Sequence, residues 1–79
     1  MSGAAAHIDK LVHSANQIGR FFAGQGDDAQ AVSAIADHLT KFWEPRLREE
    51  IIAHVDSGGA GLDPLVLVAI RGLARLRHG

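Results

Sequence analysis

The residues best suited to chemistry in this chain lie together in the stretch HLTKFWEPRLR, from His38 to Arg48. Two adjacent aromatics, Phe42 and Trp43, precede a proline, and Arg46 and Arg48 follow it. Guanidinium groups at the start of a helix, beside an aromatic ring, could hold an anion or a nucleotide through the helix dipole and stacking. The same residue types are also common anchors of protein–protein interfaces. The stretch is therefore a candidate for either kind of binding.

Five histidines raise the question of a metal site, but their spacing does not favour one. Paired ligands on a helix usually lie four residues apart, whereas these are scattered over separate stretches: His7, His13, His38, His54 and His78. The chain also lacks cysteine and tyrosine, and its few serines have no paired base. We therefore predict no metal site, no catalytic residue and no bound cofactor in this chain.

Length and composition indicate one small domain. A chain of 79 residues buries only about 60% of its unfolded surface, so a partner that covers apolar surface would add stability. The 47% apolar and 22% charged content is typical of a folded chain. A formal net charge of −1 provides no field that would recruit nucleic acid or an acidic membrane. We expect a cytoplasmic protein, because no secretory signal is present and the longest apolar run, Leu65 to Ile70, is too short to span a bilayer.

Hydrophobic periodicity predicts an all-α fold, a small single domain of three to four short helices at residues 8–79. Residues 1–7 are expected to form a flexible leader. Apolar residues recur every three to four positions, as on the buried face of a helix, and in the last helix this face includes Leu76. In the first helix, Asn16 and Gln17 fall opposite this face, on the solvent side. The predicted helices cover approximately residues 8–23, 29–43, 45–56 and 64–77.

Turn and capping residues lie between these helices. Asp27 or Asp28 can cap the second helix, and Asp63 can cap the last one. Pro45 ends the second helix and suits the first turn of the third. The glycine-rich SGGAG at 57–61 could be taken for a phosphate cradle, but it lacks the lysine and the preceding strand of such a loop. We predict a helix-to-helix turn there.

Several apolar side chains are left over once the buried stripes are filled. Phe21 lies off the stripe of the first helix, and Leu67 and Val68 lie across the last helix from its buried residues. At the corner between the second and third helices we place Phe42 largely in the core and Trp43 at the surface. Leftover apolar side chains beside arginines predict a surface that binds another protein.

Three stretches of the sequence together resemble one protein family. They are KLVHSANQIGRFF at 10–22, AIADHLTKFWEPRLR at 34–48 and GGAGLDPLV at 58–66. In this order and spacing they resemble the delta subunit of cytoplasmic NAD-dependent formate dehydrogenases, which are multi-subunit molybdenum or tungsten enzymes. Ser14 and Leu47 stand where the resemblance leads us to expect methionine.

The resemblance implies a non-catalytic small subunit that associates with the large catalytic (alpha) subunit. The catalytic subunit would hold bis-molybdopterin guanine dinucleotide and iron–sulfur clusters, while other subunits would carry FMN and meet NAD. The small subunit would stabilise the complex or assist cofactor insertion. The residues that we infer to contact the partner come from the matching motifs and the leftover apolar positions: Asn16, Gln17, Phe21, Trp43, Arg46, Arg48, Leu67 and Val68.

Two functional hypotheses therefore stand side by side. In the first, the chain is a delta subunit that docks on the catalytic subunit, with no nucleic-acid or membrane partner. In the second, it is a small regulatory module that binds a nucleotide or another anion through Arg46, Arg48 and a helix N-terminus.

Overall fold

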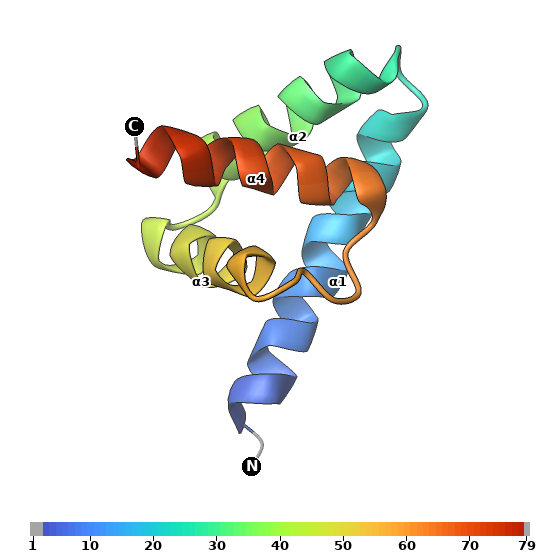
Figure 1. Cartoon of the computed structure of the whole chain (residues 1–79). Coiled ribbons are helices and arrows are strands. Elements are labelled where there is room, and N and C mark those ends of the chain that lie inside the picture. The colour runs from blue at the N-terminus through green and yellow to red at the C-terminus, as the bar shows by residue number, and fades with distance from the viewer. Residues whose placement is uncertain (1–2, 79) are drawn as a thin grey trace.

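Four helices account for most of the described chain (Figure 1). The computed structural model describes residues 3–78, and among them the side chains of residues 7–76. In chain order the helices are α1 (Gly3–Ala23), α2 (Asp28–Phe42), α3 (Pro45–Asp56) and α4 (Pro64–His78). No strand occurs among the described residues, so the predicted all-α class is confirmed.

The first helix begins earlier than its apolar stripe predicts. α1 starts at Gly3, so the predicted leader is helical from Gly3 to His7, while residues 1 and 2 lie outside the described residues. Positions 4–6 are all alanine, which is the best helix former. Helix propensity can extend a helix without any packing partner. The blue end of α1 accordingly projects beyond the rest of the fold in Figure 1.

Local caps set where α2 and α3 begin. Asp27 is the N-cap of α2, and its carboxylate accepts a hydrogen bond of 2.8 Å from the backbone N–H of Gln30. In return, the side-chain oxygen of Gln30 accepts one of 3.1 Å from the N–H of Asp27, which completes a capping box. α3 starts at Pro45. Proline has no N–H, but the first N–H groups of a helix have no partner within the helix, so none is lost. Both starts agree with the predicted ones to within one residue.

The break after α3 uses left-handed backbone that glycine adopts most readily. The φ angles of Gly58, Gly59 and Gly61 are 121°, 68° and 85°. The N–H groups of Gly58 and Gly59 donate to the carbonyls of Val55 and His54, each at 2.9 Å. These bonds satisfy carbonyl groups that the end of α3 leaves free, and the predicted helix-to-helix turn is confirmed.

The core lies where α2, α3 and α4 meet, with α1 packed against one side. Its largest fully buried side chains are Ile35, Leu39, Ile51, Val66 and Ile70. α1 contributes Leu11 and Ala15 to the same cluster. α4 makes its broadest contact with α2, which it crosses in Figure 1.

α1 approaches α4 closely at Gly19. A Cβ atom at this position would overlap Cγ2 of Val66, a side chain that is fully buried. Valine is branched at Cβ and has few rotamers to choose from, so it cannot turn away. Gly19 therefore sets the distance between the two helices.

We predict that Gly19→Ala lowers the free energy of unfolding by about 1–3 kcal/mol through overpacking, although alanine is the better helix former. Gly72→Ala is the matched control, because Gly72 is also helical and a Cβ there would meet nothing within 4 Å. That exchange should leave stability unchanged or raise it by up to about 1 kcal/mol. Denaturant unfolding followed by circular dichroism measures both variants, and equal stabilities would contradict the close approach.

Candidate docking surface

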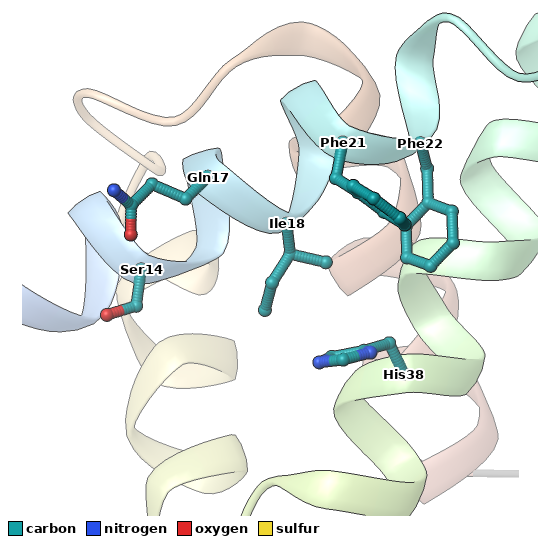
Figure 2. A pocket seen from close by; sticks show the side chains of 6 residues that line it. All are labelled: Ser14, Gln17, Ile18, Phe21, Phe22 and His38. Atoms are coloured by element: carbon teal, nitrogen blue, oxygen red, sulfur yellow. The ribbon is translucent and has the colours of Figure 1, made fainter.

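α1 and α2 form a groove with a volume of about 410 Å³ (Figure 2). We call it the aromatic groove and define it by its lining residues: Ser14, Gln17, Ile18, Phe21, Phe22 and His38. Figure 2 shows the two phenylalanines at one end, Ser14 and Gln17 at the other, and the His38 ring of α2 across from Ile18. The lining is thus mostly apolar, with polar groups at one end.

Aromatic rings form a continuous line from α1 to α2. The ring centroids of Phe21 and Phe22 are 5.0 Å apart with an interplanar angle of 79°. Phe22 lies 6.1 Å from His38, and His38 lies 4.8 Å from Phe42 at the end of α2. These distances and tilted geometries are those that aromatic pairs prefer, so the line of rings extends the groove as far as Phe42.

Both ends of this line are open to solvent. Phe21 is 65% exposed and Phe42 is 72% exposed, whereas Phe22 and His38 between them are half-buried. Exposed aromatics joined by one apolar surface mark an interaction site more often than single exposed apolar residues do. A concave apolar surface of this kind fits the apolar face of a helix or loop from another polypeptide.

Phe42 and Trp43 both differ in burial from the sequence prediction. Phe42, expected in the core, is exposed, while Trp43, expected at the surface, packs against the core. α2 ends at Phe42, and Trp43 takes extended backbone with φ −87° and ψ 140°. Helical periodicity predicts side-chain directions only within the helix, so it cannot predict where the side chain of Trp43 points. The predicted placement of Phe42 is wrong, and Trp43 is half-buried where a surface position was expected.

Sequence reasoning also misses the α2 side of the groove. It identifies Phe21 and Gln17 on α1, but it includes neither His38 nor Phe42 among the contact residues. A signal for this pair is present, because residues four positions apart share one face of a helix. A histidine and a phenylalanine at that spacing, close to a helix end, could have been paired with Phe21.

Asn16 and Gln17 have different surroundings, although the sequence places both on the solvent side of α1. Gln17 is exposed and lines the groove. Asn16 is only 8% exposed. Its Nδ2 donates to the carbonyl of Gly61, and its Oδ1 accepts from the N–H of Asp63, each at 2.9 Å. The predicted surface position of Asn16 is therefore wrong, since its amide is engaged within the chain.

The two arginines of the predicted anion site have separate partners. Nη1 of the half-buried Arg48 donates to the carbonyls of Trp43 at 2.6 Å and Thr40 at 3.2 Å, at the end of α2. The side chain of Arg46 is 87% exposed and its Nε lies 4.0 Å from Glu50, one turn further along α3. A cation at the carbonyl end of a helix complements its dipole. Arg48 therefore has a structural partner that the sequence does not reveal.

We predict that Arg48→Ala lowers the free energy of unfolding by about 1–2 kcal/mol, because two carbonyls at the end of α2 lose a charged donor. Arg46→Ala is the matched control and should change stability by less than about 0.5 kcal/mol, since exposed ion pairs contribute little. Thermal unfolding measures both. A loss of the same size in the two variants would show that Arg48 does not act as a cap.

The apolar residues of α4 divide between core and surface. Leu67, expected at the surface, is half-buried and packs against the core beside Gly59. Val68 is 51% exposed, as predicted. Leu76, expected to be buried, is 79% exposed. Among the described side chains, the buried part of α4 ends at Ala74, before Leu76 is reached. Val68 and Leu76 do not line the aromatic groove.

Other features of the described residues offer less for a functional site. A second hollow of about 380 Å³ lies between α1 and α4, and within it Arg20 Nε lies 3.7 Å from Asp63 Oδ2, so these charges are already paired. No group of three or more histidine, aspartate or glutamate residues among the described ones is placed to hold a metal ion; the side chain of His78 lies outside them. No helix in this part of the chain has both the length and the apolar character to cross a bilayer.

Comparison with known proteins supplies the family. The model of the NADH-dependent formate dehydrogenase delta subunit family, FdsD, matches residues 10–70. The matched span contains every residue of the aromatic groove, Phe42, all of α2 and α3, and the start of α4. No curated protein and no solved structure matches the chain. The chain therefore belongs to the family of NADH-dependent formate dehydrogenase delta subunits.

Proposed function

We propose that this chain is a non-catalytic accessory subunit that docks on the catalytic (alpha) subunit of its formate dehydrogenase through the aromatic groove and Phe42. The observation that carries the proposal is the exposure of Phe21 and Phe42 at the two ends of one line of rings. Membership of the delta-subunit family supplies the class of partner. A large neighbouring subunit would cover these rings.

Covering the groove would stabilise both the complex and the chain. Burial of a phenylalanine side chain contributes about 1.5–3 kcal/mol, and clustered aromatics are frequent hot spots of interfaces. A chain of this length has a small core of its own. A partner that binds only the folded form raises the apparent stability of that form, so docking and folding support each other.

Polar groups at one end of the groove would orient the partner. Gln17 offers an amide donor and an acceptor, Ser14 offers a hydroxyl, and both residues are exposed. The imidazole of His38 lies between the rings of Phe22 and Phe42. We infer that the docking segment places apolar side chains on the rings and a backbone or side-chain amide against Gln17.

In this proposal the cofactors belong to the partners. The catalytic subunit holds bis-molybdopterin guanine dinucleotide and iron–sulfur clusters, other subunits carry FMN and the NAD site, and the complex is cytoplasmic. The small subunit either stabilises the assembled enzyme or assists cofactor insertion into the catalytic subunit. Both roles need the same docking contact, so the contact is tested first.

Co-expression tests the docking directly. The chain carries an affinity tag and is produced together with the catalytic subunit, and the complex is isolated through the tag. We expect the catalytic subunit to co-purify in stoichiometric amount and to elute together with the tagged chain in size-exclusion chromatography. Elution of the tagged chain alone would reject the proposal.

The order of addition separates the two roles. The complex is made in cells that lack this chain, and the purified chain is added afterwards. If the chain stabilises the finished enzyme, late addition raises the Tm of the complex and restores formate oxidation. If it assists cofactor insertion, late addition restores neither the molybdenum content nor the activity, whereas co-expression restores both.

A further inference from the structure

The outer side of α4 carries a second surface without a described partner. Its members lie at the spacings of one helix face, i, i+3, i+4, i+7 and i+8. We call it the α4 outer face and define it by Val68, Arg71, Gly72, Arg75 and Leu76. The opposite side of the helix supplies the buried residues Val66, Ala69, Ile70 and Ala74.

Two kinds of side chain run along the α4 outer face. Val68 and Leu76 are exposed aliphatic residues, and between them lies Gly72, where a Cβ would meet only open space. Arg71 and Arg75, one turn apart, are also exposed. Neither guanidinium has a hydrogen bond or an ion pair with the part of the chain whose side chains are described. The face thus combines an apolar stripe with two guanidinium groups that no described side chain pairs with.

The lack of a pairing side chain distinguishes the two arginines from most cations of the described chain. The cations that are paired or bonded within it are Arg20, Lys41, Arg46 and Arg48. An arginine placed beside an exposed apolar stripe can pack its stem on a partner and direct its planar group to a carboxylate. Within the described part of the chain nothing occupies these two guanidinium groups, so they can bind acidic groups of another molecule.

We propose that the α4 outer face binds an acidic amphipathic helix of another subunit, an inference that rests on the proposed function. Carboxylates one turn apart on that helix would pair with Arg71 and Arg75 through two-pronged hydrogen bonds. Its aliphatic residues would pack on Val68 and Leu76, with Gly72 allowing a close approach. A protein partner suits this face better than nucleic acid or a membrane, because the charge is local and the chain's formal net charge is −1.

The α4 outer face and the aromatic groove point in different directions. α1 meets α4 at Gly19, which packs on Val66. Phe21 follows two residues later, about 200° further around the helix, so it projects from the other side of α1. One short segment cannot occupy both surfaces. The chain would therefore connect two separate segments of the complex.

Photocrosslinking in the co-expressed complex tests the inference. The probe, p-benzoylphenylalanine, replaces Val68 in one sample and Phe21 in another. We expect the probe at position 68 to capture a peptide of another subunit in which aspartate or glutamate recurs every three or four positions beside aliphatic residues. The probe at position 21 should capture a different peptide.

The remaining outcomes are also decisive. The inference is overturned if position 68 gives no crosslink while position 21 does, or if position 68 captures lipid, nucleic acid, a second copy of this chain or a peptide without the acidic pattern. A crosslink from position 68 alone supports the α4 outer face and rejects the aromatic groove. No crosslink from either position rejects both proposals.

Charge removal provides an independent measurement. Arg71→Gln/Arg75→Gln should weaken retention of the crosslinked subunit about tenfold at low salt, and less at high salt where charges are screened. Adding Ser33→Arg and Ala53→Arg, at exposed positions of α2 and α3, restores the net charge and should not restore binding. Recovery of binding in that variant would indicate a general charge effect and overturn the inference. Circular dichroism checks that each variant is folded.

Discussion

Replacing Phe21 and Phe42 together with serine is expected to abolish co-purification of the catalytic subunit while the free chain stays folded. Truncating an aromatic hot spot costs about 2 kcal/mol or more in binding. Two such losses amount to about 4 kcal/mol, which weakens the affinity about a thousandfold. The free chain loses little, because both rings are mostly exposed in it. Pull-down followed by titration calorimetry measures the change in Kd.

Two controls make this prediction specific to the aromatic groove. Phe21→Leu/Phe42→Leu keeps apolar side chains at both ends and should retain most of the affinity. Ala53→Ser introduces a hydroxyl at an exposed position of α3 and should bind like the wild type. Binding of wild-type strength by the double serine variant would place the docking surface elsewhere. If that variant loses helicity, Phe42→Ser alone carries the test, since Phe42 is the more exposed ring.

The boundaries between the helices could be predicted because their causes are local in sequence. Asp27 and Gln30 form the capping box of α2 within four residues. Pro45 begins α3, because the φ angle that its ring fixes suits the first turn of a helix. The glycines at 57–61 supply the left-handed turn. Each signal acts through neighbours along the chain, so no knowledge of the tertiary fold is needed. The family resemblance is likewise carried by short contiguous motifs at 10–22, 34–48 and 58–66.

The docking surface could be predicted only in part, because its composition depends on where helices end and cross. Phe21 lies off the buried stripe of its own helix, and this is visible in the sequence. The exposure of Phe42 depends on α2 ending there, and the burial of Asn16 depends on a loop 45 residues away in sequence. Helical periodicity carries no information on either. Of the residues inferred to contact the partner, Asn16 is therefore buried within the fold, and Trp43 is half-buried against the core.

The corner between α2 and α3 links the fold to the proposed docking surface. Arg48 donates to the carbonyls of Trp43 and Thr40, so it ties the start of α3 to the end of α2. With the backbone held in this way, Trp43 packs against the core and Phe42 remains outside. We infer that Arg48 thereby helps to present Phe42 to a partner. Its truncation should weaken docking less than loss of Phe42 does.

Asn16→Ala is expected to lower the free energy of unfolding by about 2–4 kcal/mol. The amide of Asn16 bonds both the carbonyl of Gly61 and the N–H of Asp63, so it joins α1 to the loop that leads into α4. Each of these part-buried hydrogen bonds contributes about 0.5–1.5 kcal/mol, and the loss of the buried amide leaves a cavity that adds to the cost. A chain of this size has a total stability of about 4–12 kcal/mol. The Tm should therefore fall by about 10–20 °C in a calorimetric scan.

Two further substitutions identify the cause of this loss. Gln17→Ala changes the exposed neighbour and should alter stability by less than about 0.5 kcal/mol. Asn16→Asp keeps the acceptor for the N–H of Asp63, but an ionised carboxylate cannot donate to the carbonyl of Gly61. Protonation restores that donor and is favoured in the folded state, so the difference from wild type should shrink as the pH falls toward about 4 and be smallest below it. If Asn16→Asp is as stable as the wild type at pH 7, Asn16 acts through its volume, because aspartate keeps that volume and loses only the donated hydrogen bond.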